Sequence, residues 1–200
     1  MLNEILSIGF FTSLLAGTIR LATPILMPAL GQIYTQRAGI LNLGVEGTML
    51  IASILGFAAV ASGASLWVGF IVGIITGAVY ALLMAWLSVT LRVNQVIAGI
   101  GMNVLATGLA AYIYRLLFGI RALPAKITSF PAVNIPWLSG IPYLGTILFQ
   151  HNILVYLAFA MVPLTWFFLE KTMFGLKIKM VGEHPRAADS RGIRLSLESG

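Results

Sequence analysis

Residues 47–91 contain no Asp, Glu, Lys or Arg, and this run limits the possible folds more than any other feature of the chain. A helix needs about 20 mostly apolar residues to cross the hydrocarbon core of a bilayer, so the run is long enough for two crossings with a turn at 61–65. Overall, 59% of the residues are hydrophobic and 9% are charged, whereas soluble domains carry about 25% charged residues. The sequence therefore predicts an all-α, polytopic integral membrane protein.

The chain divides into an expected membrane region, residues 1–169, and a cytoplasmic loop, residues 170–200. The expected spans are 5–36 (crossing once or twice), 47–62, 65–91, 93–118 and 145–169, or about five to six crossings at the usual span length. Pro24 and Pro28 are expected to break or kink the first segment. Small residues recur every four positions in another span and predict close helix packing within the chain; they are Gly69, Gly73, Gly77, Ala81 and Ala85.

The charges orient the spans. Half of the 12 basic residues lie in the 170–200 loop, which places this loop in the cytoplasm by the positive-inside rule. The net charge of +6 is explained by this orientation, so a nucleic-acid partner is not expected. Glu4 and the lack of an early basic residue argue against a cleaved secretory signal. Within the loop, residues 182–185 are predicted to form a turn and residues 185–191 a short helix that ends at Gly192. This short helix either docks into a groove on a partner protein or is simply a solvated segment.

Polar residues interrupt the apolar sequence at 34–47. Glu46 needs a charged partner or an aqueous cavity at membrane depth, and Arg37 is the nearest candidate. The glycines permit irregular backbone, so the segment is either a broken helix beside a translocation path or a polar hairpin at the interface. Asn103 either lines a path or makes a hydrogen bond between helices, and Gln95, near a helix end, is expected to be structural.

Catalytic and cofactor motifs are missing from the sequence. There is no Cys, no HExxH metal motif and no GxxxxGK[ST] phosphate loop, so this chain is not expected to be an enzyme or to bind a metal or cofactor. If ATP drives the protein, ATP and Mg²⁺ must bind to a partner subunit. The alternatives are a secondary transporter driven by an ion gradient, with Glu46 as its coupling site, and a non-transporting membrane scaffold or intramembrane enzyme. The missing motifs disfavour the enzyme.

Two stretches resemble a known family. Residues 37–49, RAGILNLGVEGTM, resemble the RAGxxNxGxEGxM motif of permease subunits of bacterial and archaeal ABC importers. The branch is the one for simple sugars and nucleosides, related to the ribose and branched-chain amino acid permeases. Residues 181–193, VGEHPRAADSRGI, resemble the family's cytoplasmic coupling segment xGxNPxAAxxxGI, with His184 in place of the usual Asn. The resemblance covers essentially the whole chain.

This resemblance implies two sets of functional residues. The ATPase-coupling set is Gly182, Glu183, Pro185, Arg186, Ala187, Ala188, Asp189, Arg191 and Gly192. The membrane motif and pathway set is Arg37, Gly39, Asn42, Gly44, Glu46, Gly47 and Asn103. The implied partners are ABC ATPase subunits, a second permease subunit (identical or homologous), an extracytoplasmic substrate-binding protein and the bilayer of a prokaryotic plasma membrane. Because such permeases continue for several spans after the coupling segment, we expect this chain to be truncated.

Overall fold

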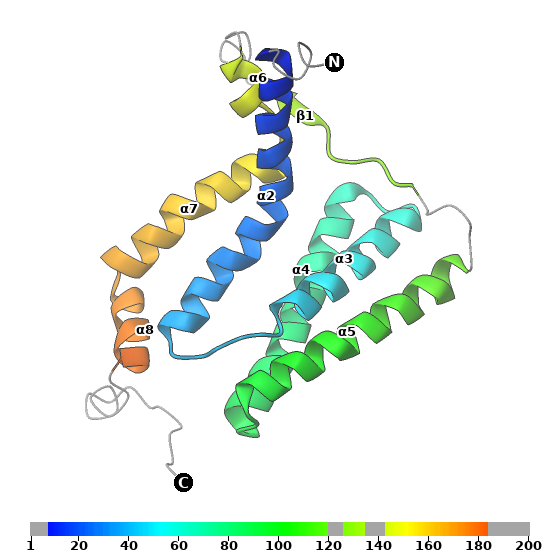
Figure 1. Cartoon of the computed structure of the whole chain (residues 1–200). Helices are drawn as coiled ribbons and strands as arrows, with labels where there is room; N and C mark the ends of the chain where they lie inside the picture. The colour runs from blue at the N-terminus through cyan, green and yellow to red at the C-terminus, as the bar shows by residue number, and fades with distance from the viewer. Residues whose placement is uncertain (1–7, 120–125, 135–142, 184–200) are drawn as a thin grey trace. The chain divides into compact units, whose positions relative to one another are not determined.

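The computed structural model describes residues 8–119, 126–134 and 143–183 (Figure 1). Its elements are α2 (Ile8–Arg37), α3 (Val45–Ala61), α4 (Leu66–Ala85), the π-helical turn η1 (Trp86–Thr90), α5 (Gln95–Phe118), β1 (Ala132–Asn134), α6 (Leu144–Leu148), β2 (Gln150–Asn152), α7 (Ile153–Lys171) and α8 (Met173–Glu183). Within these residues, four segments are long and apolar enough to cross a membrane: Ile8–Arg37, Leu66–Thr90, Gln95–Phe118 and Ile153–Lys171. With the shorter apolar helix α3, they confirm the predicted all-α membrane class.

The first segment is one continuous helix. α2 extends over 30 residues and contains both Pro24 and Pro28, so of the predicted break or kink, the break does not occur. Each proline removes one backbone N–H, and membrane helices tolerate this loss because small local adjustments satisfy the freed carbonyls.

The chain divides into two compact units, Met1–Tyr34 with Phe130–Gly200, and Thr35–Ser129. In the second unit α3 packs against both α4 and α5. Side-chain caps fix where two of these helices begin: Ser65 accepts a hydrogen bond from the Val68 N–H, and Asn94 accepts from the N–H groups of Val96 and Ile97. Such caps satisfy amides that have no partner within the helix.

Three of the small residues that recur every four positions in α4, namely Gly69, Gly73 and Gly77, face α3. We call them the glycine ridge. A Cβ on Gly69 would lie 2.9 Å from the Gly56 carbonyl oxygen, and a Cβ on Gly73 would lie 3.3 Å from the Ala52 carbonyl oxygen. A Cβ on Gly77 would lie 3.3 Å from the Ala52 Cβ. The missing side chains thus let two backbones approach within one chain, which is how small residues promote helix association in lipid.

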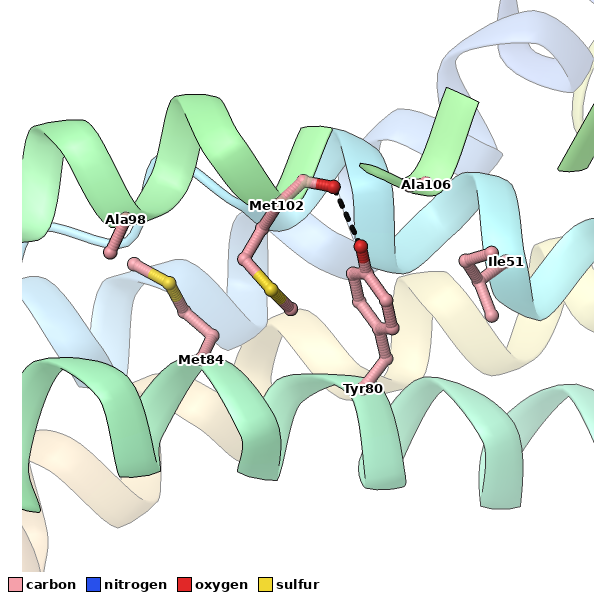
Figure 2. Packing of buried hydrophobic residues seen from close by; sticks show 6 residues of the cluster. All are labelled: Ile51, Tyr80, Met84, Ala98, Met102 and Ala106. Atoms are coloured by element: carbon pink, nitrogen blue, oxygen red, sulfur yellow. Dashed lines mark hydrogen bonds between the residues drawn. The ribbon is translucent and has the colours of Figure 1, made fainter. Parts of the chain in front are cut away.

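A small core joins the three helices (Figure 2). It consists of Ile51, Tyr80, Met84, Ala98, Met102 and Ala106. The Tyr80 hydroxyl donates a hydrogen bond to the Met102 carbonyl oxygen at 2.6 Å, so the phenol is satisfied although it is buried. This bond and the contacts around it hold α4 against α5.

In the first unit, β1 pairs with β2 in antiparallel register, with Val133 opposite His151. α7 begins at Ile153 because the Asn152 side chain accepts a hydrogen bond from the Val155 N–H and caps the helix. The helix therefore lies later than the expected 145–169 span, and α6 and β2 occupy the first part of that stretch.

Candidate functional site

The segment between α2 and α3 is built on a helix end that requires glycine. Gly39 has a φ of 80°, in the left-handed region that other residues adopt at a cost. Its N–H donates to the Gln36 carbonyl at 3.0 Å, and the Ile40 N–H donates to the Thr35 carbonyl at 2.9 Å. These two bonds form a Schellman motif, which ends α2 and sends the chain into an irregular stretch.

Asn42 shapes the approach to α3. Its side-chain oxygen accepts a hydrogen bond from the Gly44 N–H at 3.0 Å, a local turn that asparagine makes readily. Gly44 is the N-cap of α3 and contributes no side chain to cap it, although the Thr48 hydroxyl donates to the Gly44 carbonyl at 3.0 Å. Asn42 thus lies before the first residue of α3.

Side chains of α5 satisfy the backbone groups that this stretch leaves open. The Asn103 side-chain oxygen accepts from the Gly47 N–H at 2.8 Å, and its NH₂ group donates to the Leu43 carbonyl at 3.0 Å. The Gln95 side-chain oxygen accepts from the Leu41 N–H at 2.8 Å. Asn103 therefore caps the first turn of α3 from a neighbouring helix. Irregular backbone at membrane depth requires such cover by protein or a water-filled cavity.

Glycine permits the close approach on which these bonds depend. A Cβ on Gly99 would lie 2.6 Å from the Leu43 Cβ, and a Cβ on Gly47 would lie 2.9 Å from the Asn103 side-chain oxygen. Gln95, Gly99 and Asn103 are four residues apart, so they share one face of α5. We call these three residues the clamp.

Arg37 and Glu46 do not form the expected ion pair. Within residues 8–119, the structure records no salt bridge between them, and both residues are exposed. Each charge lies at a helix end that favours it: Glu46 in the first turn of α3 and Arg37 in the last turn of α2. The helix dipole stabilises a carboxylate at the former and a guanidinium at the latter, so neither needs the other. Glu46 is left available for a group outside this chain or for water.

Gly182 and Glu183 are the last two residues of α8, so the prediction that they open a turn is wrong. Because proline disfavours the helical conformation for the residue before it, Pro185 allows a helix to continue to Glu183. The remaining coupling residues lie outside the described residues; they are Pro185, Arg186, Ala187, Ala188, Asp189, Arg191 and Gly192.

The structure thus brings together Asn42, Gly44, Gly47 and Asn103 of the predicted membrane set, and Gly39 ends the helix before them. The predicted membrane set does not include Gln95 and Gly99, which the structure adds to this site. Their four-residue spacing with Asn103 is the sequence signal that places them on the same helix face.

Comparison with known proteins gives a family match and several relatives. The model of the family described as "Branched-chain amino acid transport system / permease component" matches residues 14–196. A putative glucose ABC transporter permease protein of Haloferax volcanii is 39% identical over 92% of this chain and 56% of its own length. A guanosine ABC transporter permease protein of Bacillus subtilis is 36% identical over 89% of this chain and 58% of its own length. A nucleoside ABC transporter permease protein of Lactococcus lactis is 31% identical over 91% of this chain and 59% of its own length. The chain thus spans less than two thirds of these relatives, and no solved structure matches it.

Proposed function

This chain belongs to the family of branched-chain amino acid transport system permease components, and from this premise we propose that it acts as the transmembrane permease subunit of an ATP-driven ABC importer. The relatives that carry such names cover most of the chain. The family explains why a strongly apolar chain without catalytic motifs carries a polar segment inside its membrane region.

The observation that carries the proposal is the clamped stretch before α3. Backbone N–H and C=O groups of Leu41, Leu43 and Gly47 are satisfied by two side chains of α5, while Glu46 stays exposed at the start of α3. Discontinuous helices with one end aimed at the solute are a common way to build transporter sites. We infer that the start of α3 borders the substrate pathway and that the clamp keeps it in place.

The proposed solute is small, polar and uncharged overall, such as a simple sugar or a nucleoside. The named relatives transport glucose, guanosine or nucleosides according to their descriptions. Glu46 and Thr48 supply carboxylate and hydroxyl groups near the start of α3, and these groups suit the hydroxyl-rich surface of such a solute. A carboxylate accepts hydrogen bonds, and a hydroxyl group can both donate and accept them.

ATP and Mg²⁺ would bind to separate ATPase subunits, because the sequence contains no phosphate-binding loop. These subunits would dock on residues 182–192 in the cytoplasm of a prokaryotic cell. A second permease subunit would complete the pathway in the plasma membrane, and an extracytoplasmic binding protein would deliver the solute.

The test is co-purification of the tagged chain with the ATPase subunits encoded beside it, in mild detergent. We expect a stable complex, and we expect its loss in the charge-reversed double variant Arg186→Glu, Asp189→Arg. Arg194→Glu, which reverses a charge just beyond the coupling segment, is the matched control and should retain the ATPase. Failure of the unaltered chain to capture any ATPase would contradict the proposal.

Uptake measurements separate the importer from the ion-driven alternative. For the importer, uptake of labelled guanosine or glucose stops when cellular ATP is depleted and survives collapse of the ion gradient. The reverse pattern, together with loss of uptake in Glu46→Gln, would favour a secondary transporter.

A further inference from the structure

A tight junction joins α8 to the end of the membrane helix α7. Thr172 alone separates the two helices, and its hydroxyl donates to the Phe168 carbonyl and accepts from the Gly175 N–H. Thr172 thus ends one helix and caps the next. Gly175 is buried, and a Cβ there would collide with the carbonyl oxygens of Leu169 and Phe168. The chain therefore turns abruptly at this point (Figure 1).

Charged contacts hold the same junction. The Lys179 ammonium lies 2.6 Å from a Glu170 carboxylate oxygen, with the two side chains 22% and 41% exposed. The Lys171 ammonium lies 5.6 Å from the centre of the Trp166 ring, within the range of a cation–π contact. Tryptophan and lysine together at a helix end are typical of the membrane–water interface. The end of α7 therefore has the composition of a headgroup-level anchor, and α8 begins there.

Three apolar side chains on α8 are largely exposed. Met173 is 69% exposed, Phe174 is 73% exposed and Leu176 is 51% exposed. They continue the exposed apolar residues at the end of α7, where Trp166 is 58% and Phe167 is 52% exposed. Large apolar surface of this kind marks a site of interaction, and its continuity with a membrane helix indicates lipid.

Lys177 is exposed among these apolar residues. A lysine can lay its aliphatic stem along apolar surface and hold its ammonium at the headgroups. The cytoplasmic leaflet is rich in anionic lipids, which attract basic residues close to a membrane helix. The basic charge on α8 and at its junction is therefore complementary to this leaflet.

We propose that α8 lies in the headgroup zone of the cytoplasmic leaflet. Met173, Phe174 and Leu176 enter the boundary with the acyl chains, and Lys171 and Lys177 bind anionic phosphate headgroups. The partner is the lipid surface, and a protein docked on the same face is the competing outcome. The proposal needs α7 to cross the bilayer, but it does not depend on ATP or substrate, so it stands or falls separately from the importer function.

The absence of cysteine allows a clean labelling test in the full chain. Spin labels are attached to Phe174→Cys and Leu176→Cys, with Glu183→Cys as the control at the exposed polar end of α8. The chain is reconstituted in nanodiscs of phosphatidylcholine with or without phosphatidylglycerol. Collisions with oxygen report lipid, and collisions with a water-soluble nickel chelate report water.

We expect the labels at 174 and 176 to collide mainly with oxygen, and the label at 183 mainly with nickel. Phosphatidylglycerol should increase the ratio of lipid-embedded to water-exposed label at 174 and 176, as reported by the oxygen and nickel collisions. In anionic discs, Lys177→Gln should decrease this ratio about five-fold, which is equivalent to about 1 kcal/mol for one basic residue near the surface. Lys126→Gln, outside α7 and α8, controls for the loss of one positive charge.

Two results would overturn the proposal. One is nickel accessibility at 174 and 176 equal to that at 183 in both lipid compositions. The other is shielding of 174 and 176 from both oxygen and nickel, since this would show that protein rather than lipid covers the face. A normal circular dichroism spectrum for each variant establishes that the helices are intact.

Discussion

At the scale of single residues, Asn103 is the most informative position, because both ends of its side-chain amide bind the backbone around the start of α3. Asn103→Leu leaves the Gly47 N–H and the Leu43 carbonyl without these partners. Gly47 is buried, and a buried polar group that loses its partner costs about 1–3 kcal/mol, so we expect a loss of about that size. The measurement is unfolding in detergent with increasing dodecyl sulfate.

Thr107→Val provides the control for Asn103→Leu. Thr107 lies one turn further along α5 and donates to the Asn103 carbonyl within its own helix. Its removal leaves no backbone group of another helix unpaired, so the expected change in stability is small. Equal losses for the two variants would argue that Asn103 does not hold α3.

Gly99 gives a second test at this scale, because the same helix contains a glycine in open space. A Cβ on Gly99 would lie 2.6 Å from the Leu43 Cβ, whereas a Cβ on Gly101 meets nothing within 4 Å. Overpacking costs about 1–3 kcal/mol, and alanine in place of an unconstrained helical glycine gains about 0.5–1 kcal/mol. We therefore expect Gly99→Ala to destabilise the protein and Gly101→Ala to stabilise it, as measured by thermal unfolding. Changes of the same sign would contradict the clamp geometry.

The residues of the clamp show why sequence gives this site only in part. The glycine-rich string 37–47 predicts irregular backbone, and Gly39 and Asn42 have the residue types that a Schellman end and a local turn require. The groups that Asn103 and Gln95 bind are backbone amides and carbonyls, which every residue carries. Nothing in the sequence therefore distinguishes Asn103 beside a pathway from Asn103 as a cap on another helix.

At the scale of helices, the ridge of α4 predicts a graded series. A Cβ on Gly69 would lie 2.9 Å from the Gly56 carbonyl oxygen, a backbone atom that cannot easily move, whereas on Gly77 it would lie 3.3 Å from the Ala52 Cβ. We expect Gly69→Ala to cost about 1–3 kcal/mol and Gly77→Ala much less, because a small shift accommodates it. Dodecyl sulfate unfolding of both variants checks the order, and a larger loss for Gly77→Ala would contradict this packing of α3 on α4.

The positions of helices follow from the sequence where an uncharged run is bounded by residues that can cap a helix. The uncharged run predicts α3 and α4, and Ser65 and Asn94 mark where α4 and α5 begin. The pairing of β1 with β2 joins residues that are far apart in the chain, and three-residue strands carry too little alternation to be recognised. The start of α7 at Ile153 follows from the same local structure and was therefore missed as well.

At the scale of the whole molecule, the long helices expose apolar side chains that water would not tolerate in such number. Leu21 is 75%, Leu116 is 70% and Val104 is 69% exposed, although leucine and valine are among the residue types most often buried in soluble proteins. The side-chain hydrogen bonds that join different segments of the second unit include those of the clamp and of Tyr80. The exposed apolar faces of these helices suit contact with lipid, while protein packing joins α3 to α4 and α5 at the glycine contacts, the small core and the clamp.

This division of the surface predicts the effect of a charge placed on it. Val79 is 62% exposed near the middle of the span Leu66–Thr90, and Trp67 is 52% exposed at its start. In water, either change to lysine would alter stability by less than about 0.5 kcal/mol. In a bilayer, Val79→Lys should cost about 2.5–3.5 kcal/mol of insertion free energy, since the charge lies at the centre, whereas Trp67→Lys should cost much less because the ammonium reaches the headgroups. To measure this cost, residues 66–90 are placed in a host membrane protein that carries glycosylation acceptor sites on both sides of the segment. The pattern of glycosylation then gives the fractions of inserted and translocated chains. Equal costs at the two positions would show that the segment does not cross the membrane in this register, and the assignment of α4 as a span would fall.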